Sequence, residues 1–547
     1  MSLQPRVVSE IPEETQRVAK AAFRQGNRAM QMRDELGSLF SDEQFADLFP
    51  NVGRRAETPW RLALVTVLQF AENLTDRQAA DAVRGRIDWK YALSLELTDV
   101  GFDFSVLTEF RSRLASSGAE ARLFQIMLTQ FEARRLLKAR GKQRTDSTHI
   151  VAAVHRLNQF ELVHETLRHT LNELALQAAV WLKQRVTAEW FERYSQRTST
   201  YLLPKKESER QAWAAQVGSD GLWLLEQLYH EAQDTELVKL PAVTVLWRVW
   251  LQNFYQEDGR IRLREPKDQP PSAQRIASPY DVDARYSTKR DVSWTGYKVH
   301  LTETCDTDLP HLIVNVETRS STEPDHAVTP LVHDHLAQKG RLPAEHFVDQ
   351  GYMSVKQLAD AREQHQIELM GAVPDDNSWQ ARQSGYDSRH FSIDWEHAAA
   401  VCPQGKHSCS WSLAKTRSER AVVKIKFRHA DCSVCPVIAL CTDNHEQRRT
   451  LSILSPQSDF ETQQWARQRQ QTHEFREQCA TRAGVEGTIS QAVVALGARR
   501  SRYRGKAKTH FQHLVTAAAI NLLRVLDWLH ETPRSTTPKS HFARLAA

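Results

Sequence analysis

The stretch Arg140–Val154, RGKQRTDSTHIVAAV, decides the fold, because the sequence changes there from helical to strand-like patterning. Gly141 and a polar run lead into β-branched residues, which predicts a strand over residues 143–154. Asp146 lies inside that predicted strand, so it is the first candidate functional residue.

Further strands follow downstream. Residues 283–318 alternate as DARYSTKRDVSWTGYKVHLTETCD and HLIVNVET, which predicts strands paired as a hairpin across DTDLP. AEHFVDQGY predicts a short strand that ends at Asp349, and IELMGAVP predicts another. Helical patterns lie between these strands, and a later helix carries Glu486. This order predicts an α/β core whose sheet begins with a hairpin.

Two long insertions interrupt that core. Residues 155–275 are mostly helical in pattern and hold six of the fourteen tryptophans, so they should pack as a unit with a core of their own. Residues 376–475 are polar, irregular and β-rich, and hold five of the seven cysteines. The tail, residues 531–547, is predicted to be disordered.

Residues 1–135 predict an all-α N-terminal domain of helix-turn-helix size. Either DNA binding or plain helical packing fits this pattern. In DFSVLTEFRSRL the apolar residues share one helix face and the arginines point outward: Leu107, Phe110 and Leu114 inward, Arg111 and Arg113 outward.

Composition sets the broad class. The chain has 547 residues, too many for one hydrophobic core, with 41% hydrophobic and 25% charged residues, which is ordinary for a globular protein. Because no long uncharged apolar run and no apolar N-terminal segment exist, we expect no membrane span and a cytoplasmic protein with reduced cysteines.

Three acids suggest one chemistry. Asp146 lies in a strand, Asp349 at the carboxyl end of another, and Glu486 on a helix that can pack across the sheet. Three carboxylates meeting there would hold two hard cations such as Mg²⁺, a site suited to in-line phosphoryl displacement. A cap, turn or salt bridge is the alternative role for each acid taken alone.

A basic stretch follows the third acid. In RAGVEGTISQAVVALGARRSRYRGKAK, residues 482–508, Arg482 lies one helical turn before Glu486. Six basic residues lie within Arg499–Lys508; the net charge is +5, and without them it would be 5 − 6 = −1. Such a stretch is either a phosphate-binding footprint or a solvated surface. The candidate DNA contacts are Arg482, Arg499, Arg500, Arg502, Arg504, Lys506 and Lys508, together with Lys298 on a predicted strand.

Several blocks resemble those of bacterial insertion-sequence transposases of the DDE type, and are most similar to the group numbered eleven-eighty-two. They are RTDSTHI, WTGYKVHLTETCD, FVDQGYMS and RAGVEGTISQ…RRSRYRGKAKTHFQH…AAAINLLR, with LQFAENLTDRQAADAVRGRIDWKYAL at the N-terminal end. The similarity spans roughly residues 40–530. It implies an RNase H-like catalytic domain at 136–530, a mixed sheet flanked by helices, preceded by a DNA-binding domain at 1–135.

The resemblance also implies residue roles. Asp146, Asp349 and Glu486 match the metal-binding triad, and Arg482 matches the arginine of the Y-x2-R-x3-E motif. Cys479 stands at the tyrosine position and Val493 at the lysine position, with the arginine-rich run as the candidate replacement for that lysine. Lys298 and His300 share one strand face and lie either near the site or simply on the strand surface.

The implied activity is transposition. Mg²⁺ (or Mn²⁺), with two ions bound, would support hydrolysis at the terminal inverted repeats of an element and attack of the freed 3′-hydroxyl on target DNA. The implied partners are double-stranded DNA and a second copy of the chain on it. A catalytically silent DNA-binding relative and another RNase H-like nuclease are the alternatives; the presence of all three acids favours the enzyme.

The cysteine cluster has the form C-x6-C…C-x2-C-x5-C. The C-x2-C step is the spacing of a zinc knuckle, and a structural Zn²⁺ would supply folding energy to a polar insertion. Reduced thiols without metal are the alternative. The four expected ligands are Cys402, Cys432, Cys435 and Cys441.

Overall fold

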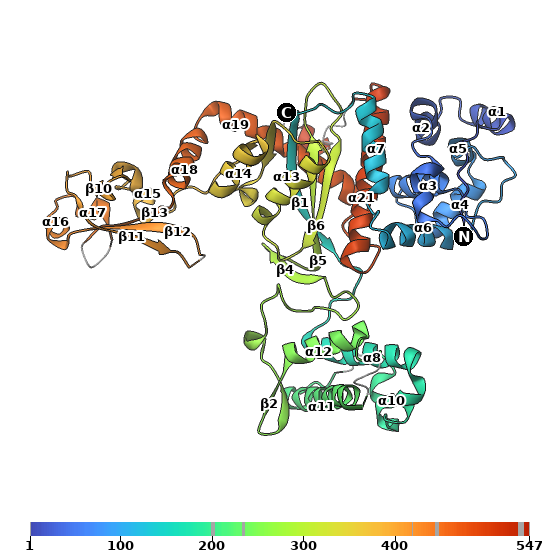
Figure 1. Cartoon of the computed structure of the whole chain (residues 1–547), viewed down its shortest axis with the longest axis horizontal. Helices are drawn as coiled ribbons and strands as arrows, with labels where there is room; N and C mark the ends of the chain where they lie inside the picture. Colours follow the sequence, from blue (N-terminus) through green and yellow to red (C-terminus); the bar gives the residue numbers. More distant parts are fainter. Residues whose placement is uncertain are drawn as a thin grey trace.

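The computed structural model describes residues 2–197, 203–231, 236–417, 419–443, 448–533 and 541–545. A central sheet carries a helical region on one side, a helical lobe below and a small β-rich lobe at the far end (Figure 1). Among the described residues, no helix is both long and apolar enough to cross a membrane. About half of the predicted tail lies outside the described residues; within the described part, His541–Arg544 forms the short helix α22.

The expected α/β core is present as a mixed, six-stranded sheet. Its strands are β1 (Lys142–Val151), β4 (Arg285–Lys289), β5 (Val292–Thr304), β6 (Ile313–Ser320), β7 (Glu345–Val348) and β8 (Glu368–Met370). The order β6-β5-β1-β7-β8 places β1 at the centre, and β4 pairs with β5 as well. Only β5 runs antiparallel to its neighbours, since β1, β7 and β8 pair in parallel.

Helices cover this sheet. The long helix α21 (Lys506–Leu529) and helix α13 (Thr329–Gln338) contact β6, while α14 (Val355–His365) contacts β8. Helix α20 (Gly484–Ser490), which continues into a π-helical turn at Gln491–Ala495, lies against β1. The sheet is therefore buried beneath helices drawn from distant parts of the chain.

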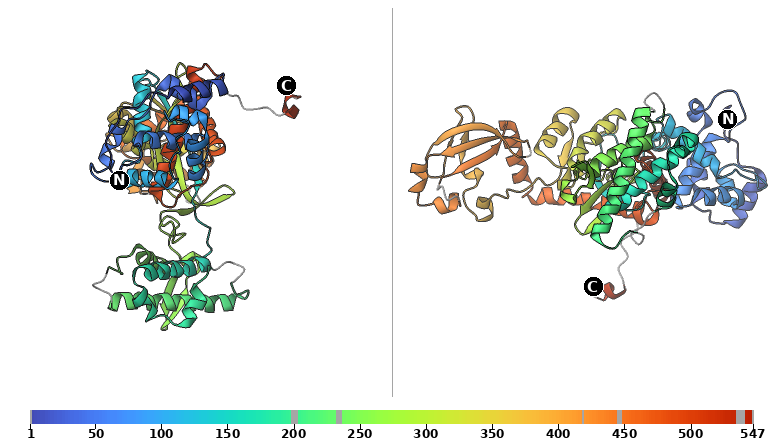
Figure 2. Two further views of the ribbon diagram at one scale, coloured as in Figure 1. Left: turned by 90° about the vertical axis from the view of Figure 1, so that its right-hand side faces the viewer. Right: turned by 90° about the horizontal axis from the view of Figure 1, so that it is seen from below.

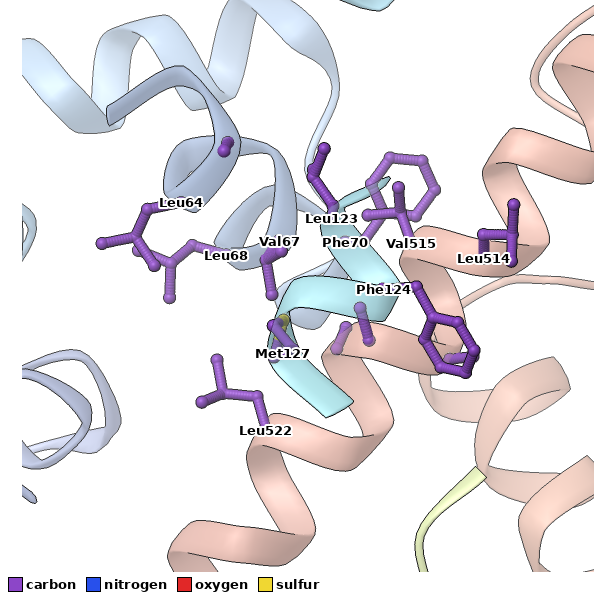
Figure 3. Packing of buried hydrophobic residues seen from close by; sticks show 14 of the residues in the cluster. Leu64, Val67, Leu68, Phe70, Leu123, Phe124, Met127, Leu514, Val515 and Leu522 are labelled. Atoms are coloured by element: carbon purple, nitrogen blue, oxygen red, sulfur yellow. The ribbon is translucent and has the colours of Figure 1, made fainter. Parts of the chain in front are cut away.

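The N-terminal region is helical, as predicted, but its helices share a core with the sheet. In Figure 3, apolar side chains of α3 and α7 interlock with Leu514, Val515 and Leu522 of α21. The helices are α1 (Glu13–Ala22), α2 (Arg28–Leu36), η1 (Asp42–Leu48), α3 (Pro59–Ala71), α4 (Asp76–Gly85), α5 (Ile87–Ala92), α6 (Ser105–Ser116) and α7 (Arg122–Ala133).

One prediction for this region was wrong. Leu107, Phe110 and Leu114 of α6 are buried as expected, but Arg111 is buried too. Its guanidinium pairs with Asp76 at the start of α4, because a buried charge requires an opposite charge close by.

The first insertion forms a helical lobe with its own core, joined to the sheet by residues 152–158 and 264–284 (Figure 2). Its last residues were predicted to be helical but form a hairpin of β2 (Phe254–Glu257) and β3 (Arg260–Leu263). Asp258 and Gly259 both have positive φ, 50° and 72°, the backbone of a tight hairpin turn. The helices are α8 (Gln159–Gln177), α9 (Ala179–Lys183), α10 (Ala188–Tyr194), α11 (Glu207–Glu231) and α12 (Pro241–Asn253).

The second insertion forms the cysteine lobe, residues 386–454, built on three antiparallel strands in the order β11-β12-β13. A small separate core lies beneath them. Helices α18 (Gln457–Arg469) and α19 (His473–Ala480) lead from the lobe back to the sheet. The lobe's elements are β9 (Ser392–Asp394), β10 (Ala399–Val401), β11 (Ser408–Lys415), β12 (Ala421–Phe427), α16 (His429–Ser433), α17 (Ile438–Cys441) and β13 (Thr450–Leu454).

Candidate active site

The two predicted catalytic aspartates lie on neighbouring strands. Thr145 of β1 is in register with Val348 of β7, and the two strands are parallel. Asp146 directly follows Thr145, and Asp349 directly follows Val348. The two aspartates are therefore neighbours on adjacent strands. Strand β7 ends at Val348, which leaves Asp349 exposed at the carboxyl end of its strand.

The environment of Asp146 combines burial with opposing charges. Burial raises the pKa of its carboxyl group and the nearby charge of Asp349 adds to the rise, while the Ser147 amide and Arg482 oppose it. The Ser147 N–H donates to Asp146 Oδ1 at 2.7 Å. A partly desolvated carboxylate beside a second one would be stabilised by a cation.

Arg482 contacts two of the three predicted acids. Its Nη1 donates to Asp146 Oδ2 at 3.0 Å, and its Nη2 lies 3.7 Å from Glu486 Oε1. The Glu486 side chain is 68% exposed, whereas that of Asp146 is 20% exposed. One guanidinium thus joins a strand carboxylate to a helix carboxylate across a sequence separation of more than 300 residues.

The donor set fits a hard divalent cation, because carboxylate oxygens are the ligands that Mg²⁺ prefers. Asp146 lies beside Asp349, and Arg482 contacts both Asp146 and Glu486. However, within the described residues no group of three or more His, Cys, Asp or Glu side chains lies close enough to hold a metal. Metal binding there would require Arg482 to leave the carboxylates.

A buried ionic network fixes the helix of Glu486 onto the sheet. Glu303 of β5, whose side chain is 0% exposed, accepts from Arg144 Nε at 2.7 Å and from Arg524 Nη1 at 2.7 Å. Thr488 of α20 donates to the same carboxylate, and Arg144 Nη1 donates to the Thr481 carbonyl oxygen at 2.7 Å. Burial alone would raise the pKa of Glu303, but the charges of Arg524 and Arg144 lower it below its ordinary value. We call the side chains of Glu303, Arg144, Arg524 and Thr488 the brace.

The brace depends on a glycine. A Cβ placed on Gly484 would lie 2.1 Å from Arg144 Nη1. The Arg144 guanidinium can therefore pack against α20 only because residue 484 is a glycine and has no side chain. Gly487, one turn further along α20, has no atom within 4 Å of such a Cβ. The brace was not predicted from the sequence. The one signal for it in the sequence was a glutamate, Glu303, at an inward-facing position of a predicted strand.

A second polar group lies behind the aspartates. The Tyr352 hydroxyl bonds His300 Nδ1 at 2.6 Å, and both side chains are buried. Burial lowers the pKa of His300 to about 3, so the ring is neutral. Lys298 pairs with Asp325 at 2.9 Å and is partly buried. The predicted DNA contact Lys298 therefore already has a partner inside the protein.

The first part of the basic stretch is joined to β1. Arg499 donates to Thr148 Oγ1 at 2.8 Å and to the His149 carbonyl oxygen at 2.6 Å. The Val151 amide donates to the Arg499 carbonyl oxygen at 2.9 Å, and the Ser501 amide donates to the Val151 carbonyl oxygen at 2.8 Å. This segment thus pairs, through a single parallel bridge between Arg500 and Val151, with the last residue of the strand that carries Asp146.

Arg502 reaches the N-terminal helices. It donates to the Leu74 carbonyl oxygen at 2.7 Å and to the Asn73 side chain, and its guanidinium lies 4.5 Å from the Phe70 ring centre. Arg500, Arg504 and Lys508 are exposed, while Lys506 is half-buried. The predicted DNA contacts of the basic stretch therefore form two groups, arginines that hydrogen-bond to the protein itself and exposed cations. Among the exposed cations, the Arg504 guanidinium lies 5.2 Å from the Tyr280 ring centre.

Four of the five clustered cysteines lie together in the cysteine lobe. Cys402, Cys432, Cys435 and Cys441 line one cavity, and Cys409 does not. Burial raises the pKa of the Cys441 thiol to about 11, and the other three cysteines add to the rise. The structure thus brings together the four residues expected as zinc ligands.

Comparison with protein families confirms the resemblance to DDE transposases. Residues 401–526 match the family described as the transposase DDE domain, and residues 17–113 match a transposase domain (DUF772). The first match covers the cysteine lobe from Val401 onward and includes Glu486, and the second contains most of the N-terminal helices. Comparison with curated proteins and with solved structures gave no match. Two regions of the chain therefore match transposase domain families, which is consistent with an insertion-sequence DDE transposase.

Proposed function

We propose that the protein is a DNA transposase that binds the ends of an insertion sequence and catalyses strand cleavage followed by 3′-hydroxyl strand transfer. The proposal rests on two contacts, Asp146 beside Asp349 and Arg482 with both Asp146 and Glu486, in a chain with two transposase domain matches. The strand order β6-β5-β1-β7-β8, with β5 alone antiparallel, supports an RNase H-like core.

The three carboxylates would hold Mg²⁺ or Mn²⁺. Two such ions, when bound, would stabilise the entering and leaving oxygens of an in-line displacement at phosphorus. The protein itself positions the acids. Strands β1 and β7 hold the two aspartates in register, and the brace holds α20, the helix that carries Glu486. Arg482 would exchange its carboxylate partners for a DNA phosphate, since guanidinium binds both.

Binding to DNA is proposed to involve the exposed cations of the basic stretch, Arg500, Arg504 and Lys508, and two copies of the chain on the paired element ends. A cytoplasmic location follows from the same activity. The inactive-relative alternative is not favoured, because all three acids are present and Asp146 and Asp349 lie side by side.

The test is a strand-nicking assay on DNA that bears the element's ends, with Mg²⁺ present. Asp146→Ala and Glu486→Gln should abolish cutting and leave DNA binding in place, because they remove metal ligands and no phosphate contact. Glu477→Gln is the matched control, since its side chain is 71% exposed on the preceding helix. Normal cutting by either triad variant would overturn the assignment.

A further inference from the structure

The cysteine lobe contains a cavity of about 190 Å³ whose walls include four thiols. Cys402 follows β10, Cys432 and Cys435 lie at α16 and the turn after it, and Cys441 ends α17. These residues come from three separate loops or helix ends, and no other cysteine of the described residues lines the cavity. Sequence spacing and three-dimensional placement therefore select the same four thiols independently.

Cys409 provides an internal contrast. It lies on β11 with an exposed side chain, and its Sγ is 3.4 Å from the Lys426 carbonyl oxygen of the neighbouring strand. It belongs to the same cluster in sequence but lies outside the cavity. If the insertion were simply rich in cysteine, there would be no reason for four of its cysteines to share one cavity and for Cys409 to lie outside it.

The backbone around the cavity is arranged to hold sulfur. The turn Cys402–Lys406 closes with the Cys402 amide donating to the Lys406 carbonyl oxygen at 2.9 Å, and Gly405 adopts φ 75° within it. The Lys406 amide in turn donates to Cys402 Sγ at 3.4 Å. This contact helps to fix the position of the Cys402 sulfur.

We propose that Cys402, Cys432, Cys435 and Cys441 bind one structural Zn²⁺ ion. Zinc in structural sites is four-coordinate and tetrahedral, and four thiolates form a closed site with no position left for a substrate. The sulfurs line the cavity without forming a ready-made group of metal ligands in the described residues, so their side chains must turn inward to reach Zn–S distances of about 2.3 Å.

The charges around the cavity suit such a site. A zinc ion with four thiolates keeps a net negative charge. Lys406 and Arg449 both line the cavity, and Asp431 is its one acidic wall residue among those described. The surrounding cations would therefore offset the charge of the site.

The lobe also needs the stabilisation that a metal gives. Its core contains only eight buried apolar residues among those the structure describes, from Phe391 to Ile453. Small units with so little buried apolar surface commonly rely on a metal or disulfides for stability. All four thiols are free in the structure, which leaves them available as ligands.

The experiment is elemental analysis of the full chain, purified without chelator or affinity metal. We expect about one zinc per chain in the wild-type protein and in Cys409→Ser, and a loss of most of that zinc in Cys432→Ser. A folded wild-type protein without zinc would overturn the proposal, as would equal zinc loss in both variants.

A second measurement uses the wild-type chain alone, so it does not depend on whether Cys432→Ser folds. Refolding with Co²⁺ in place of zinc should give the intense thiolate-to-cobalt absorption of a tetrahedral site. A thiol titration should show four fewer reactive thiols with metal than after chelation. Absence of that absorption, or thiols consumed by disulfide formation, would contradict the proposal and leave the transposase assignment untouched.

Discussion

Two pairs of arginines lie near the two ends of strand β1, and the pairs differ in what they bind. At the start of the strand, Arg144 and Arg524 are bound to the buried carboxylate of Glu303. At its end, Arg499 and Arg502 bind neutral carbonyl, hydroxyl and amide oxygens. The first set lies in the core behind the active site, and the second joins the basic stretch to the sheet and to the N-terminal helices.

The difference shows that local charge density is a poor guide to the role of an arginine. The basic stretch is the most conspicuous cluster in the sequence, yet two of its arginines serve the fold. The arginines of the brace have different surroundings in the sequence, since Arg144 ends another basic run, residues 134–144, whereas Arg524 has no basic neighbour within five residues. Both nevertheless help to fix the helix that carries Glu486. Desolvation explains the contrast, because a buried guanidinium is costly unless a charge or several oxygens satisfy it.

The largest expected effect comes from removing the charge of the brace. Glu303→Gln leaves two buried guanidinium groups without their carboxylate, which should lower the free energy of unfolding by about 3–5 kcal/mol. Hydrogen exchange in residues 482–490 should accelerate, and strand cutting should fall with it. Thermal unfolding and exchange mass spectrometry measure these changes.

Glu317→Gln is the control for that experiment. Glu317 is also a buried strand carboxylate, but its partner His335 is 41% exposed and can be solvated once the pair is broken. We expect a smaller decrease in stability and no change in exchange at residues 482–490. Equal effects of the two substitutions would show that the brace has no special part in holding α20.

A medium effect tests how closely Arg144 packs against α20. Gly484→Ala places a methyl group where the guanidinium lies and should cost about 1–3 kcal/mol. Gly487→Ala, on the same helix with open space around it, should be neutral or stabilising by about 0.5–1 kcal/mol. Melting temperatures that fall equally for both variants would contradict the close packing of Arg144 on the helix.

The smallest expected effect, per residue, concerns the other end of β1. Replacing Arg500, Arg504 and Lys508 with alanine should reduce the salt dependence of DNA binding by roughly 0.9 in log–log slope for each phosphate that is no longer neutralised. Replacing Arg499 and Arg502 should lower the melting temperature and leave that slope nearly unchanged, because those side chains bind protein oxygens. Binding titrations across salt concentrations distinguish the two sets of variants. A slope that falls only when Arg499 and Arg502 are replaced would show that these two arginines, and not the exposed cations, bind the DNA phosphates.

Much of the core could be read from the sequence because its signals are local. The strand of Asp146, the strand that ends at Asp349, the helices between them and the buried α21 all follow from periodicity and turn residues. The same local reasoning failed at residues 254–263, where a two-residue turn overrode a helical expectation, and at Arg111, where a partner on another helix allowed burial.

The sequence by itself determined the order of strands and helices, the three acids, the four cysteines and the position of the basic stretch. Only the tertiary structure decided which polar groups meet: Arg482 with Asp146 and Glu486, Glu303 with Arg144 and Arg524, and Arg499 with neutral oxygens at the end of β1. These pairs join residues that are mostly hundreds of positions apart. They form because folding brings distant segments together, and the hydrophobic periodicity along the chain does not show which segments will meet.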